Sequence, residues 1–391
     1  MKYIKVFLVF TSCLLVFLLS GCGGTQPGTS PAIFIAAEWN VQALFDGSET
    51  GNEYAEYREA AGWTREKYNA RLTAISQAIQ KMIPDEMNRS LKKEVPDLMG
   101  FIEIEHAGIL NDLAGGMLSK HGYNWTAFAN LPGSSLGIGF MSRYPLEDIK
   151  AHSITVDTNT APRPILELKM IFRSGTARTA VRDANGPGGR LREKSLIFLL
   201  CHWKSKLGGD DATEAMRRFS AKVVQRRLRE LKETEPETPV IVMGDFNENH
   251  DEFFRRSGSI ITALLPDDSD ASQLVSQLAS HSMNDFLILS REKPPHPNYF
   301  PDDVPVLYSP WEKELTRGSY YYRDDWETID HILLSEGFFS GSGWEFSGCH
   351  VSNHAPFTLS GGAPNNYVPR NGRGLSDHLP LVLYLCENTG D

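Results

Sequence analysis

The sequence predicts an α/β protein in which mixed β-sheets carry helices on their outer faces. Apolar segments of strand length alternate with segments of helical periodicity along the chain. Several strands follow one another as hairpin-like neighbours, which run antiparallel, so the sheets are not purely parallel. The 391 residues, 41% hydrophobic and 23% charged, suit a globular protein of one large or two small domains. Functional motifs spread from end to end favour one domain, at residues 32–386.

The first half of the chain is expected to begin with a strand at 33–37 that delivers Asn40 to its end. Residues 64–83 form a predicted helix because apolar side chains recur there at helical intervals, from Tyr68 to Ile83. The other elements expected in this half are a strand at 98–104, a helix at 107–118, and strands at 136–141 and 165–172.

The second half contains the most informative junction in the chain. The strand Pro239–Met243 is rich in β-favouring residues and ends in Gly244-Asp245-Phe246-Asn247, where the glycine lets the chain turn. A strand at 196–201 places His202 at its end, and residues 214–231 form an amphipathic helix. On that helix we expect Arg217 and Arg218 on the solvated face. Residues 173–193 form a Gly-rich polar loop, and residues 293–326 a candidate substrate-facing loop.

The N-terminus has the pattern of a bacterial lipoprotein signal. Lys2 and Lys5 precede an apolar stretch at 6–19, which ends in Leu19-Ser20-Gly21-Cys22. We therefore predict a signal peptide at 1–21, a lipid-modified Cys22, and a flexible tether at 22–31. The protein would be held in the bacterial cell envelope outside the cytoplasm, at the inner or the outer membrane.

Charge and cysteine content restrict the partners. The formal net charge is −10, so nucleic-acid binding requires a local basic patch. Outside the signal region the cysteines are Cys201, Cys349 and Cys386, too few for a disulfide scaffold and not at a metal-binding spacing. Cys349 and Cys386 form either a disulfide bridge or two buried free thiols.

Six short motifs, in order, resemble the endonuclease/exonuclease/phosphatase superfamily, especially its bacterial secreted members. They are Trp39-Asn40-Val41-Gln42, residues 96–105, Cys201-His202-Trp203-Lys204-Ser205-Lys206, Gly244-Asp245-Phe246-Asn247, residues 329–335, and Ser376-Asp377-His378-Leu379-Pro380. The resemblance implies a four-layer α/β sandwich (DNase I-like) and phosphoester hydrolysis with a divalent cation.

The resemblance places a metal site at Asn40, Glu103 and Asp377, whose hard oxygen ligands suit Mg²⁺ or Mn²⁺. Family members usually have glutamine before the glutamate, whereas this chain has Ile102. Strand alternation puts Glu103 and Glu105 on one face, so both are candidates, and the motif register favours Glu103.

The resemblance also assigns the catalytic residues. Asp245 would orient and deprotonate the attacking water, and Asn247 would donate to the phosphate. His378 would contact the phosphate as general acid or base, with its imidazole oriented by Asp330. His202 is the second histidine, as in secreted nucleases.

Four further residues are candidates for substrate binding. Lys204 and Arg163 offer positive charge to a phosphate, with Ser205 and Lys206 beside Lys204. An ordinary surface arginine is the alternative for Arg163. Tyr320 and Tyr322 belong to a stretch that resembles a Gly-x-Tyr-x-Tyr segment of bacterial secreted relatives, and they could stack on a base or sugar. Their spacing also fits alternate core positions of a strand.

The expected function is that of a metal-dependent phosphoester hydrolase, a secreted lipid-anchored nuclease of DNA or RNA, because residues 201–206 resemble extracellular nucleases. The alternative is a phosphomonoesterase or a phospholipase/sphingomyelinase-like hydrolase, although the Pro-Ala-Trp-Cys-Asp-Arg stretch of inositol-polyphosphate phosphatases is absent. A catalytically inactive surface-binding protein would be expected to lose catalytic residues, and all of them are present.

Overall fold

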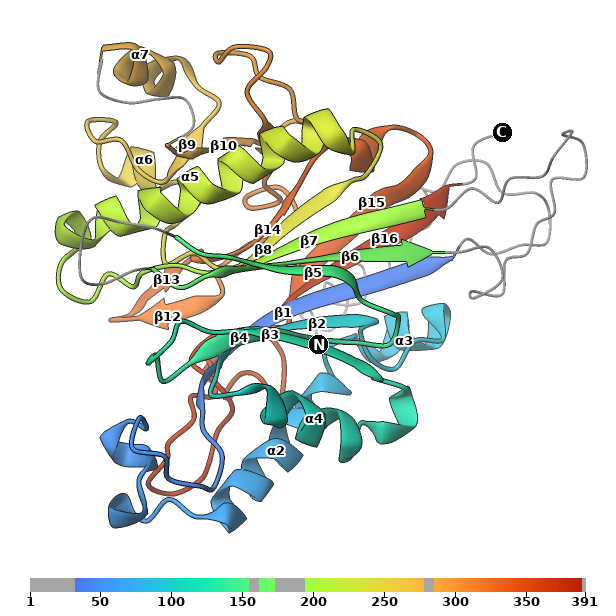
Figure 1. The fold of residues 1–391 in the computed structure, drawn as a ribbon, viewed down its shortest axis with the longest axis vertical. Coiled ribbons are helices and arrows are strands. Elements are labelled where there is room, and N and C mark those ends of the chain that lie inside the picture. The colour runs from blue at the N-terminus through green and yellow to red at the C-terminus, as the bar shows by residue number, and fades with distance from the viewer. Residues whose placement is uncertain (1–31, 155–161, 173–193, 278–284, 389–391) are drawn as a thin grey trace, which may run out of the picture.

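Two mixed β-sheets pack face to face in the computed structural model, which describes residues 32–154, 162–172, 194–277 and 285–388 (Figure 1). The smaller sheet has the strand order β15 (Gly343–Val351), β16 (Leu381–Asn388), β1 (Ile33–Leu44), β2 (Leu98–Ile104), β4 (Gly137–Ser142), β3 (Trp125–Ala129). The larger sheet has the order β5 (Glu147–His152), β6 (Ile165–Phe172), β7 (Lys194–His202), β8 (Val240–Asp245), β14 (Asp330–Leu334), β11 (Val306–Tyr308), β10 (Leu287–Ser290), β9 (Leu264–Pro266). A separate two-stranded hairpin pairs β12 (Tyr320–Tyr322) with β13 (Asp325–Glu327).

Helices cover the outer face of each sheet and complete four layers (Figure 1). The smaller sheet is covered by α2 (Arg65–Ile79), α3 (Asp85–Leu91) and α4 (Ala107–Gly115), and the larger by α5 (Asp210–Thr234), α6 (Glu252–Arg255) and α7 (Ser269–Gln277). Short 3₁₀ turns lie at Ala55–Tyr57, Glu59–Ala61, Ser119–His121 and Glu336–Phe339. The predicted four-layer α/β sandwich with mixed sheets is confirmed.

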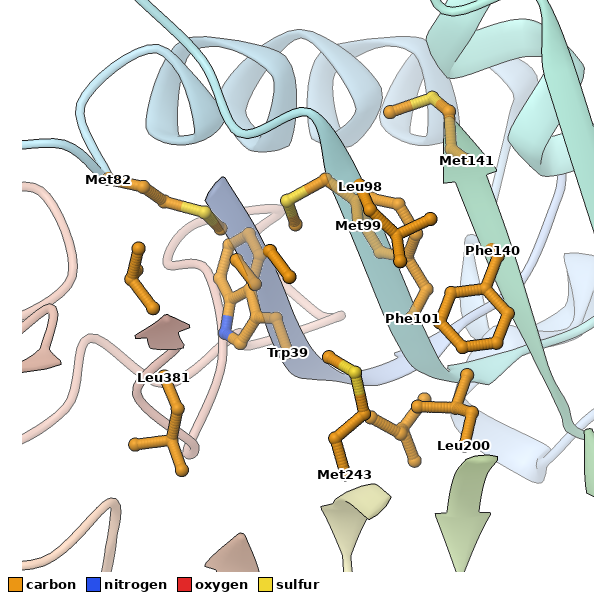
Figure 2. Close-up of a cluster of buried hydrophobic side chains, with 14 of the residues drawn as sticks. Trp39, Met82, Leu98, Met99, Phe101, Phe140, Met141, Leu200, Met243 and Leu381 are labelled. Carbon is orange, nitrogen blue, oxygen red and sulfur yellow. The ribbon is translucent and has the colours of Figure 1, made fainter. Parts of the chain in front are cut away.

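The core between the sheets is formed by apolar side chains from both. At Gly100 of β2 the sheets come close: an added Cβ would lie 2.9 Å from Leu200, 3.4 Å from Phe140 and 3.5 Å from Met243. Figure 2 shows Leu200 and Met243 reaching from the larger sheet toward the smaller one, Leu200 toward Phe140 and Met243 toward Trp39. Because all of them are fully buried, this contact fixes the separation of the strand ends that carry the site.

Several element boundaries differ from the predicted ones. The helix expected at 64–83 is capped by Thr64, whose side chain accepts from the Lys67 amide, and it ends at Ile79. The helix expected at 214–231 begins at Asp210, where two acidic residues favour the N-terminus. Residues 293–326 are not one loop, since they include β11 and β12.

Arg217 is buried, contrary to the prediction of a solvated side chain. Its guanidinium donates to Glu214 at 2.6 Å and to Glu248 at 2.9 Å. Glu248 follows the β8 strand, so its carboxylate reaches Arg217 only in the folded chain. The pattern of one helix could not reveal this partner.

The bridge between Cys349 and Cys386 is also not formed, since Cys349 is a buried free thiol. In the β15–β16 pair, Cys349 lies opposite Leu383, and Cys386 lies opposite Glu345. Three further residues along a strand add about 10 Å, which exceeds the reach of a disulfide.

The signal peptide, Cys22, the tether at 22–31 and the Gly-rich loop at 173–193 lie outside the described residues. Among the helices of the described ranges, none combines the length and apolar character needed to cross a bilayer.

Candidate active site

The predicted site residues meet where the central strands of both sheets end. β1 runs parallel to β2, and β7 runs parallel to β8, so each pair brings two strand ends to the same edge. In the larger sheet, Asp245 of β8 pairs in register with His202 on one side and Asp330 on the other. The sheet itself therefore places three of the five predicted catalytic residues side by side.

Gly244 is required at the turn that presents Asp245. Its φ is +126°, and an added Cβ would collide with the Cys201 carbonyl oxygen at 2.1 Å. The next residues bend back, so that the Asn247 amide donates to Oδ1 of Asp245 at 2.8 Å. Asn40 Nδ2 donates to the other oxygen, Oδ2, at 3.0 Å. Asp245 is thus held by a side chain of the smaller sheet and by a backbone amide of the loop that follows β8.

His378 is oriented by a carboxylate, as predicted. Its Nδ1 donates to Oδ2 of Asp330 at 2.8 Å, and Ser319 Oγ donates to the same oxygen at 2.6 Å. The backbone carbonyl of His378 accepts from the Trp39 indole at 3.0 Å. These contacts direct Nε2 toward Asp245, whose Oδ2 lies 4.0 Å away.

His202 approaches the same carboxylate. Its Nε2 lies 3.8 Å from Oδ2 of Asp245 and 3.7 Å from Oε1 of Glu103. Its Nδ1 is buried and has no hydrogen-bond partner among the described residues. Two imidazoles therefore converge on one aspartate.

Glu103 and Glu105 do not share a face, contrary to the prediction from strand alternation. Glu103 has a φ of +66°, and the β2–β4 register shifts between Ile102 and Ile104, so the alternation is interrupted at Glu103. Glu103 points to the site, where its Oε2 accepts from the Ala43 amide at 2.8 Å. Glu105 instead accepts from the Asp46 amide.

The oxygen-rich group of Asn40, Glu103 and Asp377 fits a hard divalent cation. Burial raises the pKa of Glu103, and the neighbouring Asp377 raises it further. This repulsion between carboxylates is what a bound cation would relieve. Gln42 supports the group because its Oε1 accepts from the Asp377 amide at 3.1 Å.

A different set, Asp245, Asp330 and His378, places its ligand atoms within 4.8 Å of one another. It is less suited to a cation. His378 Nδ1 and Asp330 already bond to each other.

Asp245 and the two imidazoles beside it have pKa values that are shifted in different ways. Burial raises the pKa of Asp245 to about 7, although His378 lowers it. Burial alone would lower the pKa of His378, but Asp330 raises it well above its usual value, so the ring carries a charge. Burial and then the Arg163 charge lower the pKa of His202 well below its usual value, so this ring is neutral.

Two of the residues predicted to bind phosphate, Arg163 and Lys204, lie beside the site, whereas Lys206 is paired with another residue. Arg163 Nη1 donates to the Trp203 carbonyl at 3.4 Å. Burial lowers the pKa of Lys204, and the charge of Arg163 lowers it further. Lys206 is not available, since its ammonium pairs with Glu252 at 2.9 Å. Tyr320 lies against His378, with ring centroids 4.6 Å apart.

Sequence reasoning missed two buried charged residues beside the site. Arg71 of α2 donates to the carbonyls of Val41 and Gln42, and Glu38 of β1 lies close to Asp245. Both left a signal, because Arg71 falls on the apolar stripe of its helix and Glu38 interrupts an apolar strand.

A family model described as endonuclease/exonuclease/phosphatase family matches residues 35–283, more than half of the chain. No curated protein sequence matches. Similar solved structures include a functionally unknown conserved protein from Enterococcus faecalis V583, 15% identical with a TM-score of 0.46, covering 91% of this chain and 100% of that chain. An endonuclease/exonuclease/phosphatase from Bacteroides vulgatus is 16% identical with a TM-score of 0.44, covering 90% and 98%. The human Nocturnin catalytic domain is 15% identical with a TM-score of 0.42, covering 91% and 96%. The family match, over residues that include most of the site, shows that this chain belongs to the endonuclease/exonuclease/phosphatase family.

Proposed function

We propose that this protein is a divalent-metal-dependent phosphodiesterase that cleaves nucleic acid. The observation that carries the proposal is the convergence of two imidazoles, those of His378 and His202, on Oδ2 of Asp245, at 4.0 Å and 3.8 Å. Phosphoester hydrolysis needs a base for the attacking water and donors for the phosphate oxygens, and this arrangement supplies both.

Each residue has a distinct task in the proposed reaction. The Asp245 carboxylate, fixed by Asn40 and Asn247, accepts the proton of a water aligned with phosphorus. The His378 imidazolium, held by Asp330, donates to a non-bridging oxygen and stabilises the charge that develops there. Neutral His202 offers a second hydrogen bond.

Asn40, Glu103 and Asp377 would hold Mg²⁺ or Mn²⁺, which supplies charge neutralisation at the phosphate and the leaving oxygen. The Arg163 and Lys204 side chains add positive charge beside the site and would bind the substrate phosphates. This local positive charge compensates for the formal net charge of −10.

The substrate class is tested with the full chain purified in mild detergent. Supercoiled DNA, single-stranded RNA and a panel of small phosphomonoesters are incubated with Mg²⁺, with and without EDTA. We expect nicked or shortened nucleic acid that depends on the metal. Phosphate release from small esters with intact nucleic acid would instead assign the protein as a phosphomonoesterase.

We further propose that the enzyme acts at the cell envelope, tethered by lipid-modified Cys22. The support is the lipobox pattern Leu19-Ser20-Gly21-Cys22 after an apolar stretch. In a bacterial host, the Cys22→Ala variant should no longer incorporate radiolabelled palmitate, whereas the wild-type chain should. Absence of label in the wild-type protein would exclude the anchor.

A further inference from the structure

The β12–β13 hairpin belongs to neither large sheet, yet its first residues are bonded directly to the His378 and Asp330 segments. The Leu379 amide donates to the Ser319 carbonyl at 2.7 Å, and Ser319 Oγ donates to Asp330 at 2.6 Å. The first residue of the hairpin, Tyr320, forms a β-bridge with His378. The position of the hairpin relative to the catalytic imidazole is therefore fixed by the backbone.

One face of the hairpin carries a stack of rings that begins at the imidazole. The ring of Tyr320 lies 4.6 Å from that of His378, and the ring of Tyr322 lies 6.2 Å from Tyr320 with 14° between their planes. Tyr322 is 47% exposed. The stack thus leads from the reacting group to solvent, and in Figure 1 the hairpin projects at the left edge of the molecule.

Core packing does not account for this face. On the opposite face, Tyr321 pairs across the hairpin with Trp326, and their ring centroids lie 5.0 Å apart. Trp326 contacts the main hydrophobic core. Tyr320 and Tyr322 alternate with Tyr321 and therefore point away from it.

The tip of the hairpin places a cation over the outer ring. Arg323 and Asp324 form the two-residue turn with φ values of +49° and +65°, a conformation that usually selects Asn or Gly. The Arg323 guanidinium lies 5.0 Å from the centre of the Tyr322 ring. An arginine in this strained turn brings positive charge to the outer end of the stack.

We propose that Tyr320 and Tyr322 form a stacking subsite for an unpaired nucleobase of a single-stranded nucleic acid. The inference rests on the proposed function and specifies its substrate. An aromatic side chain stacks on the face of any base, so the subsite selects unpaired bases without reading their identity. A base inside a duplex has both faces covered by its neighbours and cannot stack here. A base that stacks at the outer end would displace the Arg323 guanidinium from the Tyr322 ring, and Arg323 would then pair with the phosphate of the bound nucleotide.

The test uses a single-stranded oligonucleotide with one cleavable phosphodiester, prepared either with a base or with an abasic sugar next to that bond. In Tyr322→Leu, kcat/KM for the base-containing substrate should fall roughly tenfold, because stacking contributes ~1–3 kcal/mol per base. The fall on the abasic substrate should be much smaller. Tyr322→Phe keeps the ring and should keep the preference for the base.

The matched control is Tyr299→Leu, which removes a tyrosine that is 53% exposed in a loop beside α7. It should lower neither rate. An equal fall on both substrates in Tyr322→Leu would overturn the proposal, since it would indicate a structural role.

Binding separates this inference from the proposed function. The same two oligonucleotides are titrated with Mg²⁺ into Asp245→Asn, alone and combined with Tyr322→Leu. If the wild-type enzyme cleaves no nucleic acid, the proposed function fails. The subsite is then supported if Tyr322→Leu weakens binding of the base-containing oligonucleotide only. It is rejected if Tyr322→Leu changes the affinity for both oligonucleotides by the same factor.

Discussion

Asp245 is the residue on which the proposed chemistry depends, and its environment suits a general base that acts near neutral pH. Burial raises its pKa to about 7, in the range where a general base is most effective. The same two oxygens accept hydrogen bonds from Asn40 and the Asn247 amide, which fix the direction of the carboxylate. The smaller sheet and the loop after β8 thus act together on one carboxylate.

The rate should therefore depend on pH through this group. The base acts as a carboxylate, so kcat/KM should rise as the pH increases through about 7 at low Mg²⁺ concentration. Bound Mg²⁺ adds positive charge nearby and favours the carboxylate, so a higher Mg²⁺ concentration should move the rise to lower pH. pH–rate profiles at two Mg²⁺ concentrations measure this shift. A rate that does not change between pH 5 and 8 at either concentration would exclude Asp245 as the titrating base.

The burial of Glu38 lowers the stability of the folded protein. It is fully buried, and neither oxygen has a hydrogen-bond partner among the described residues. Burial raises its pKa well above the usual value, and Asp330 and Asp245 raise it further. The folded state therefore binds this proton more tightly than the unfolded chain does. As the pH rises above the unfolded pKa, Glu38 destabilises the fold progressively.

Replacing Glu38 with glutamine should stabilise the protein at alkaline pH. The amide has the same shape and cannot ionise, so Glu38→Gln should raise Tm at pH 8 and change it little near pH 4. Thermal unfolding followed by circular dichroism at both pH values measures the effect. An equal gain in Tm at pH 4 and pH 8 would show that the pKa of Glu38 is not raised in the folded state.

At the scale of elements, helix α2 shapes the end of strand β1 through Arg71. The guanidinium donates to the carbonyls of Val41 and Gln42 at 2.6 Å each and to Ala43 at 2.9 Å. It also lies 3.6 Å from the centre of the Tyr367 ring. Gln42 and Ala43 have φ values of +54° and +56°, a backbone conformation that residues other than glycine rarely adopt. The hydrogen bonds from Arg71 stabilise this bend.

This bend positions the predicted metal ligands, because the Ala43 amide donates to Glu103 and Gln42 contacts the Asp377 amide. Arg71→Met should therefore raise the Mg²⁺ concentration needed for half-maximal activity and lower the free energy of unfolding by about 3 kcal/mol. Arg65→Met, on the exposed side of the same helix, is the matched control. Turnover against Mg²⁺ concentration and urea unfolding are the measurements. A variant that unfolds more easily but keeps the wild-type Mg²⁺ requirement would show that Arg71 stabilises the fold without positioning the ligands.

Elements could be predicted from the sequence where local pattern decides them. The strands expected at 98–104 and 165–172 have those bounds in the structure, because apolar β-formers fill them. The bulge at Glu103 could not be predicted, since it depends on the bend at Ala43 in another strand. Arg217 was misplaced for the same reason, because its partner Glu248 comes from a distant segment.

At the scale of the whole molecule, the site exists only because the two sheets are packed together. Asn40 and Glu103 come from the smaller sheet, and His202, Asp245 and Asp330 come from the larger. The order of the motifs predicted the family and the four layers. The interactions between the sheets, such as the repulsion of Glu38 by Asp330 and Asp245, depend on packing that local sequence patterns do not predict.

The most direct test of the account is the turnover of single-stranded nucleic acid by Asp245→Asn beside the wild-type chain, with Mg²⁺. Asparagine keeps the shape and cannot accept the proton, so we predict a loss of at least about 100-fold in kcat, with Tm unchanged or raised. Wild-type turnover in a folded Asp245→Asn variant would contradict the account.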